Sequence, residues 1–201
     1  MNRLLAASFI LTMLFVGGCQ SKAVLNDMEK PVIQPARHFE DYKQTEAVIS
    51  EATRGEFTLQ VMSAKKAYRP GEEVELEARL KYAGNEEAVL IEHAASPFTF
   101  LIQEQTRAIG LGYEMDQPLI RTVLKQGQWT SERYAKQTVI IRPSPEQEAF
   151  IKEFLEQEGF PEGSYAVKVE ADFNISGQEE LQNDRYRISA EIAFEVRGEK
   201  E

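Results

Sequence analysis

The segment from residue 73 to residue 82 alternates strictly between charged and apolar side chains. Its odd-numbered positions are all charged, and its even-numbered positions are Val74, Leu76, Ala78, Leu80 and Tyr82. Successive side chains of a β-strand point to opposite faces of a sheet. This period of two therefore predicts an antiparallel strand with one face buried and the other in water.

The same period recurs along most of the chain, and turn residues such as Gly84-Asn85 and Gln126-Gly127 separate the runs. A strand is expected to begin at Phe57, and further strands are expected over 88–93, 97–103, 108–114, 119–124, 128–133, 137–142, 164–175 and 184–196. Many strands without intervening helices favour an all-β protein built as a β-sandwich.

Residues 144–161 depart from this pattern. Ser144 and Pro145 form a cap and a first-turn proline, and a glutamine follows three residues after the cap. Apolar residues then recur at helical spacing, and Gly159 with Pro161 ends the run. The segment predicts one inserted helix over about 145–158 that packs its apolar face on the core. Those apolar residues are Phe150, Ile151, Phe154 and Leu155.

The N-terminal residues have the pattern of a secretory signal. One basic residue, Arg3, precedes an apolar run from Leu4 to Val16, which is shorter than the roughly 20 residues that cross a bilayer. The sequence Val16-Gly17-Gly18-Cys19 then resembles the lipobox of bacterial lipoproteins. The resemblance implies cleavage before Cys19, a diacylglycerol on its sulfur and acyl chains such as palmitate that hold the protein on the extracytoplasmic face of a cell membrane.

Cys19 is the only cysteine of the chain. An ordinary secretory signal with an incidental cysteine is the alternative, but lipidation accounts for a lone thiol in an exported protein. Two acyl chains anchor firmly, because each buried CH₂ contributes about 0.8 kcal/mol. The chain can form no internal disulfide, so its folded part must be stable through its own core.

The expected organisation has three parts: signal peptide 1–18, lipidated N-terminus and tether 19–54, and β-sandwich domain 55–198. Phe39, Tyr42 and Ile49 fall on one helical face, which leaves a short helix over 39–50 open. If the tether is flexible, residues 20–54 would span on the order of 30–35 Å.

The formal charge is −10, and removing Arg3 with the signal makes it −11. An acidic protein without a basic patch is a poor candidate for nucleic acid or envelope polyanions. Neither His38 nor His93 belongs to a helical zinc pair, and the chain contains no Gly-x-Ser-x-Gly elbow or phosphate loop. We therefore expect no enzymatic activity.

One loop has the spacing of calcium ligands. Asp172, Asn174 and Ser176 supply oxygen atoms at the first, third and fifth positions, a glycine follows at the sixth, and Glu180 stands at the ninth. The twelfth position is Asn183 instead of the usual glutamate. The alternative is that these residues form the wet face of a strand that runs into a hairpin. No other cofactor is indicated.

Three turns resemble those of a known family. They are Tyr68-Arg69-Pro70-Gly71-Glu72, Leu124-Lys125-Gln126-Gly127-Gln128 and Phe160-Pro161-Glu162-Gly163-Ser164-Tyr165-Ala166-Val167. In this order they are similar to turns of the Bacillus intracellular proteinase inhibitor-like family over about residues 57–170. The resemblance implies an immunoglobulin-like antiparallel β-sandwich and an inhibitory activity.

These features together predict a membrane-anchored lipoprotein whose non-catalytic domain binds or modulates another cell-envelope protein. The alternatives are a surface-held proteinase inhibitor and a receptor for a metal or small ligand. Trp129, the only tryptophan, is either an interface anchor or a core residue.

Overall fold

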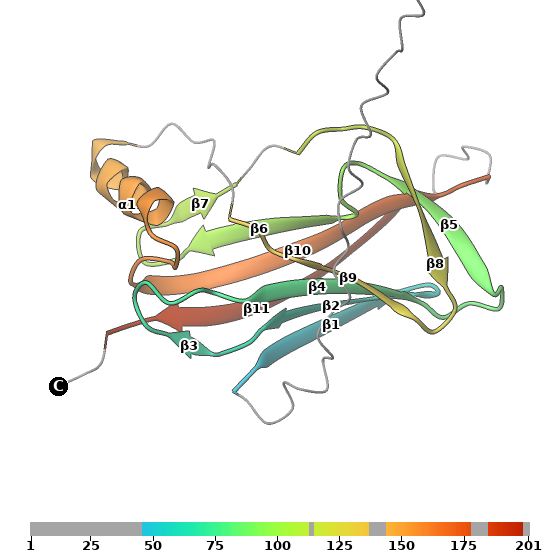
Figure 1. Ribbon diagram of the computed structural model, residues 1–201, viewed down its shortest axis with the longest axis horizontal. Helices are drawn as coiled ribbons and strands as arrows, with labels where there is room; N and C mark the ends of the chain where they lie inside the picture. Colours follow the sequence, from blue (N-terminus) through green and yellow to red (C-terminus); the bar gives the residue numbers. More distant parts are fainter. Residues whose placement is uncertain (1–45, 113–114, 137–143, 178–184, 199–201) are drawn as a thin grey trace, which may run out of the picture. The chain divides into compact units, whose positions relative to one another are not determined.

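The computed structural model describes residues 46–112, 115–136, 144–177 and 185–198, which form two β-sheets and one helix (Figure 1). In chain order the elements are β1 (Val48–Arg54), β2 (Phe57–Ser63), β3 (Ala67–Tyr68), β4 (Leu76–Tyr82), β5 (Ala88–His93), β6 (Phe98–Glu104), β7 (Ile109–Leu111), β8 (Ile120–Lys125), β9 (Trp129–Arg133), α1 (Pro145–Glu156), β10 (Gly163–Ile175) and β11 (Arg185–Val196). The prediction of a mainly β protein with one helix is confirmed.

The first sheet has the strand order β1-β2-β4-β9 and is antiparallel throughout. The alternating segment forms β4, with Leu76, Ala78 and Leu80 buried on one face as predicted. Glu77 is the exception, because it lies on the opposite face of this strand and is nevertheless buried.

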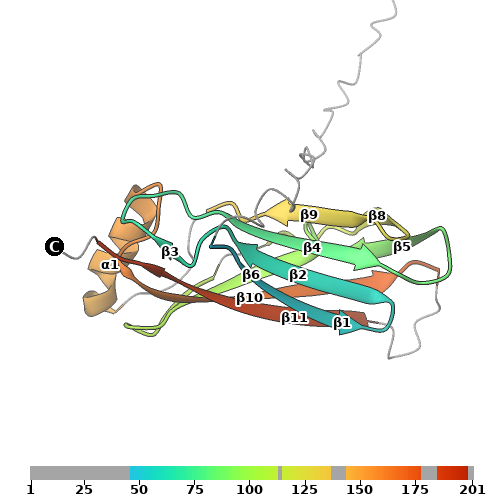
Figure 2. The same cartoon turned by 90° about the horizontal axis from the view of Figure 1, so that it is seen from below.

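The second sheet is built on β10 and β11, which pair antiparallel over their whole lengths. Along its other side β10 pairs first with β6 and then, at Asn174 and Ile175, with β5. β5 pairs in turn with β8, the last strand on that side, and Figure 2 shows β8 and β9 along the same margin. β7 pairs antiparallel with the end of β6, and the two-residue β3 runs parallel to β11.

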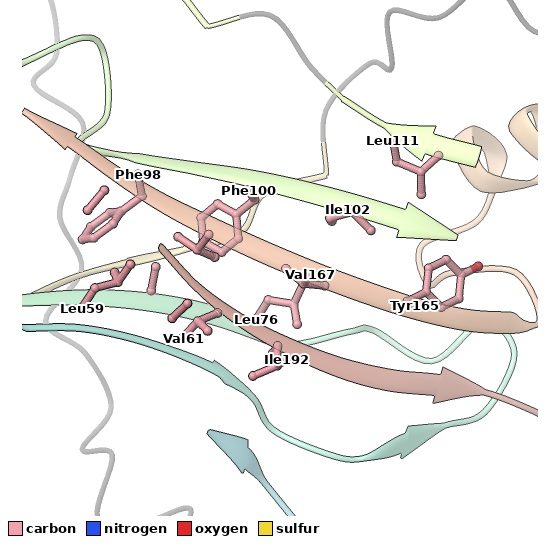
Figure 3. Close-up of a cluster of buried hydrophobic side chains, with 14 of the residues drawn as sticks. Leu59, Val61, Leu76, Phe98, Phe100, Ile102, Leu111, Tyr165, Val167 and Ile192 are labelled. Carbon is pink, nitrogen blue, oxygen red and sulfur yellow. The ribbon is translucent and has the colours of Figure 1, made fainter. Parts of the chain in front are cut away.

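The core lies between the two sheets. Figure 3 shows Leu59 and Val61 of β2 on the side facing Phe100 of β6 and Val167 of β10, and all four are buried. Burial of such a side chain stabilises the fold by about 1.5–3 kcal/mol relative to its exposed state. Phe160 adds an aromatic cluster, with ring centroids 5.0–5.7 Å from the rings of Phe154, Tyr165 and Phe194.

The helix α1 lies within one residue or two of its predicted bounds and packs three of its four apolar residues into the core. Phe150, Ile151 and Phe154 are buried, whereas Leu155 is exposed. The helix has no basic residue in its last turn. Instead Lys136 reaches this end from outside the helix, and its Nζ donates to the carbonyl oxygens of Gln157 (2.7 Å) and Gly159 (2.8 Å).

Two strands lie where none was predicted. β1 falls inside the segment assigned to the tether, so the folded domain begins before residue 55, and residues 48–50 are strand and not helix. β1 is hard to find in the sequence because Ile49 points outward while Ser50 occupies an inward position. The second is β3, which is too short to show a period. The strand predicted at 137–142 lies outside the described residues.

Among the described residues no helix combines the length and the apolar character that a bilayer crossing requires. Cys19 and the predicted signal lie outside the described residues.

Candidate interaction surface

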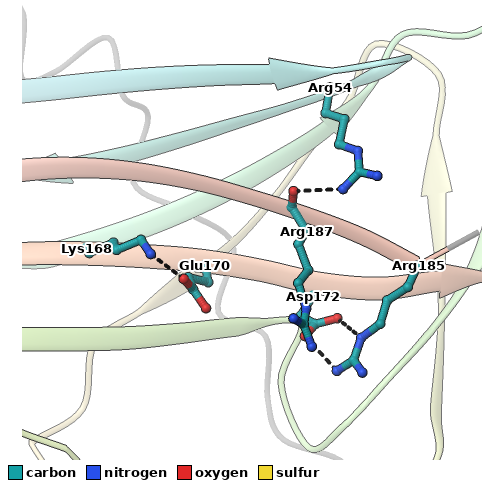
Figure 4. A network of polar contacts seen from close by, with 6 residues as sticks. All are labelled: Arg54, Lys168, Glu170, Asp172, Arg185 and Arg187. Carbon is teal, nitrogen blue, oxygen red and sulfur yellow. Dashed lines mark hydrogen bonds and ion pairs between the residues drawn. The ribbon is translucent and has the colours of Figure 1, made fainter. Parts of the chain in front are cut away.

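Asp172, the first residue of the predicted calcium loop, is held by two arginines. Its Oδ1 accepts from Arg185 Nε (2.5 Å), and its Oδ2 accepts from Arg185 Nη2 (2.7 Å) and Arg187 Nε (3.1 Å) (Figure 4). Arg187 is tied to the first sheet in turn, since Arg54 Nη1 donates to its carbonyl oxygen at 3.2 Å. A cation at Asp172 would have to displace both guanidinium groups.

The remaining loop residues belong to another network. Asn174 lies in β10, opposite Glu92 of β5, and the Ser176 hydroxyl donates to Glu92 Oε1 at 3.0 Å. Arg121 Nε donates to the same oxygen at 2.9 Å. These bonds, that from Arg121 first, lower the pKa of Glu92. Glu180 lies outside the described residues, and the described ranges contain no group of three or more acidic, histidine or cysteine side chains fit for a metal. The calcium site stays a prediction.

His93 links β5 to β8. Its Nδ1 lies 2.8 Å from the carbonyl oxygen of Ala94, and its Nε2 lies 2.8 Å from the Thr122 hydroxyl. Because a carbonyl oxygen only accepts, Nδ1 carries the proton and Nε2 accepts from Thr122. Burial lowers the pKa of His93, which favours this neutral form. The arrangement gives His93 a structural role.

Glu104 is fully buried and organises the turn that follows β6. The backbone N–H groups of Thr106 and Arg107 donate to its two carboxylate oxygens at 3.0 and 2.7 Å. Burial alone would raise the pKa of Glu104, but these hydrogen bonds and the Arg107 charge outweigh it and lower the pKa. A Cβ on the neighbouring Gly163 would lie only 2.7 Å from Glu104 Oε1, so any larger residue there would have to displace the hydrogen-bonded carboxylate.

Two other carboxyl groups have raised pKa values. Burial raises the pKa of Glu77, and its Oε1 accepts no hydrogen bond within the described structure. Burial likewise raises the pKa of Glu132, although the Ser96 hydroxyl donates to its Oε2 at 2.6 Å. Both groups lie on strands of the first sheet, Glu77 on β4 and Glu132 on β9.

Trp129 lies outside the core. Residues 129, 131 and 133 of β9 point to the outer face of the first sheet, because Trp129 pairs with Lys81 and Arg133 with Glu77. Lys81 Nζ lies 4.5 Å and Arg79 Cζ 4.2 Å from the Trp129 ring centroid, within cation–π range. The half-buried indole thus lies against the guanidinium group of Arg79 and the ammonium group of Lys81.

A shallow groove of about 490 Å³ crosses the outer face of the second sheet. Gly110, Gly112 and Ala166 leave space between the taller side chains, and the rim includes Leu101 and Lys168. The Lys168 ammonium is already paired with Glu170 at 2.5 Å (Figure 4). The other polar lining residues are Gln103, Gln105 and Glu191.

The most distinctive surface feature is an apolar strip on β5 and β8. Seven large apolar side chains of the described residues are exposed, and four of them lie here. They are Leu119 (67% exposed), Val123 (57%), Ile120 (39%) and Leu90 (36%), which we call the β8 strip. The sequence predicts both strands within one residue, but alternation alone does not reveal which strand lies at the margin of a sheet, so the strip was not predicted.

The register of β8 fixes the direction of its backbone groups. Gln126 N–H donates to the Glu87 carbonyl at 2.9 Å, and Ser176 N–H donates to the Leu90 carbonyl at 2.8 Å. Since antiparallel pairs alternate between bonded and non-bonded, the backbone groups of Ile120, Thr122 and Leu124 face β5. The backbone groups of Arg121 and Val123 therefore point away from β5, to the side on which no described strand pairs with β8; we call this the open side.

No protein-family model matches the chain, and no curated protein matches it.

Proposed function

We propose that this protein is a lipoprotein, anchored through Cys19 to the extracytoplasmic face of a membrane, whose non-catalytic immunoglobulin-like β-sandwich binds another protein of the cell envelope. The β8 strip is the observation that carries the proposal. Exposed apolar side chains scattered singly need no explanation, whereas a cluster of them at a sheet margin is typical of a binding surface.

The edge position strengthens this argument. Natural proteins protect strand edges with short strands, charges or covering segments, because an exposed apolar edge invites association. In this chain Ile120 and Val123 lie in the edge strand itself, between and beside Arg121 and Lys125, with Leu119 just before the strand and Leu90 on the neighbouring β5. We infer that a partner protein covers the β8 strip in the functional complex.

The anchor supports an envelope partner. A protein that the lipobox of residues 16–19 holds at a membrane meets the components of that envelope at high local concentration, and its tether lets the domain reach them. The proposal therefore needs only modest affinity at the β8 strip.

In-cell crosslinking tests this function. Full-length protein with a C-terminal tag is crosslinked in living cells, captured and examined by mass spectrometry, beside Cys19→Ala as the unanchored control. The proposal expects one dominant envelope protein that is lost or strongly reduced with Cys19→Ala. Capture of no protein above background would refute it.

A surface-held proteinase inhibitor is the second candidate, and it rests on the resemblance of three turns in the sequence to those of the inhibitor-like family. In the structure Gly71 and Gly127 have positive φ (76° and 70°), and the Tyr165 hydroxyl donates to the Pro161 carbonyl at 2.6 Å. Purified Cys19→Ala protein should then inhibit at least one of a panel of secreted proteinases at micromolar concentration, and inhibition of none would exclude this candidate.

A further inference from the structure

We propose that the partner binds as an extended peptide segment that adds a strand to the open side of β8, with acidic side chains opposite Arg121 and Lys125. The inference rests on the proposed function and specifies its surface and the chemistry of its partner. It follows from the backbone, the side chains and the charge of this one strand.

Four backbone groups on the open side of β8 can hydrogen bond to an added strand. The N–H and C=O groups of Arg121 and Val123 point away from β5, because the register of the β5–β8 pair directs only those of Ile120, Thr122 and Leu124 toward β5. Backbone groups spaced along an edge are matched by another extended chain, which offers donors and acceptors at the same repeat. The backbone groups of a helix are already hydrogen bonded within the helix, so a helical partner would leave the N–H and C=O groups of Arg121 and Val123 bonded only to water.

The other sheet margins of the described ranges are less suited to strand addition. β3 has two residues and β7 has three, which is too short for a stable pairing. β1 lies beside β11, to which Arg54 is hydrogen bonded, and β9 exposes no large aliphatic side chain. β8 alone combines six residues, an open side and exposed aliphatic side chains.

The distribution of the strip over both faces of the sheet favours a strand over a helix as the occupant. Leu119 and Val123 share one face with Leu90, which pairs directly with Val123, whereas Ile120 points to the other face. A helix or a flat surface would cover one of these faces. An added strand has side chains on both faces and covers both.

The charge of β8 indicates the chemistry of the occupant. Residues 119–125 carry Arg121 and Lys125 and no acidic residue, in a chain whose net charge is −10. Arg121 already donates through Nε to Glu92 of β5 at 2.9 Å, but its side chain remains 60% exposed. Both cations lie on the face of Leu119 and Val123, so that face reads apolar, cationic, apolar, cationic. An incoming strand with alternating apolar and acidic residues matches it, whereas a second copy would bring four cations along one seam.

A crosslinking ladder tests the inference in cells. A photoreactive phenylalanine analogue is placed in the full-length anchored protein at Leu119, Arg121 and Val123, one position at a time, with Thr53 on the first sheet as the control position. We expect one partner, whose crosslinked residue moves by two along a single segment with each step, and no such product from Thr53.

Proline substitution then separates backbone from side-chain recognition. Val123→Pro keeps an apolar side chain but removes the N–H that points to the open side, whereas Val123→Ala keeps the N–H and reduces the side chain. The crosslink yield from Leu119 should fall about tenfold with proline and clearly less with alanine. Circular dichroism and thermal unfolding confirm that both variants fold.

The outcomes are distinguishable. Crosslinked partner residues spaced by three or four would overturn strand addition, and so would equal losses of crosslink yield in Val123→Pro and Val123→Ala. Either result would leave the proposed function intact. Crosslinks to a second copy of this chain would also overturn it. Absence of a crosslinked partner at every position, Thr53 included, would count against the proposed function itself.

Discussion

At the scale of single residues, the buried carboxyl groups divide into two kinds. Glu104 receives two backbone hydrogen bonds and has a lowered pKa, whereas Glu77 has an oxygen without a donor among the described residues and a raised pKa. Glu77 was visible only as a charged residue of a predicted strand, and Glu104 only as one just after the strand predicted over 97–103. Their opposite environments depend on which backbone groups lie nearby, and no local pattern in the sequence encodes this.

Glu104→Gln should destabilise the protein by about 1–3 kcal/mol at neutral pH, because the hydrogen bonds to a charged acceptor are weakened. Since the folded pKa lies below the ordinary value of 4.5, the charged group stabilises the fold fully above that pH. This contribution is lost as the pH falls through the folded pKa. Urea unfolding at pH 7 and at successively lower pH measures it, and an unchanged variant at pH 7 would contradict the assignment.

Glu77→Gln should have the opposite effect and raise the free energy of unfolding at pH 7 by about 1 kcal/mol, since it removes a poorly solvated charge. The raised pKa means that the folded state favours protonated Glu77. The protonated group therefore contributes fully to the free energy of unfolding below pH 4.5, and this contribution is lost as the pH rises through the folded pKa. The gain should therefore vanish in acid. Exposed Glu73→Gln is the control, and equal effects of both variants would disprove the explanation.

Calcium binding at the loop of Asp172 is also decided by single residues. Because Arg185 and Arg187 occupy the Asp172 carboxylate, we expect millimolar calcium to leave the midpoint of thermal unfolding unchanged. Binding to the folded state alone would raise that midpoint. A rise with calcium that magnesium does not reproduce would establish the site and favour the receptor alternative.

At the scale of elements, the sequence predicts strands well where one face is uniformly apolar. β5 has its predicted bounds, and β4, β10 and β11 begin or end within two residues of theirs. β1 was missed because Val48, Ser50 and Ala52 make a weak inward face, and its strand is defined by pairing with β2. The β8 strip was missed for a related reason, since the neighbours of a strand are long-range information.

Lys136 shows how one residue fixes an element from a distance. Lys136→Met should lower the free energy of unfolding by about 1–2 kcal/mol, because the carbonyl oxygens of Gln157 and Gly159 lose their donor. Hydrogen exchange of α1 should accelerate in the same variant. Lys152→Met removes only a 3.9 Å contact to Glu156 on an exposed helix face and should change stability by less than about 0.5 kcal/mol. Similar losses from both variants would disprove the role of Lys136.

At the scale of the whole molecule, a predicted lipid anchor precedes a domain that carries the apolar β8 strip at a sheet margin. The sequence indicates both the anchor and a two-sheet β architecture, and the structure adds the surface on which a partner can dock. The same sequence could not indicate that surface, because Leu90 and Val123 come together only through the pairing of β5 with β8.

The most direct test compares two matched double variants in the in-cell capture experiment. Leu119→Glu with Val123→Glu places two charges on the β8 strip, whereas Leu101→Glu with Leu155→Glu places two charges on other exposed leucines. The account predicts that the partner captured with the unaltered protein is lost from the first variant and retained by the second, with both proteins folded and membrane-bound. Retention of the partner by the strip variant would contradict the central claim.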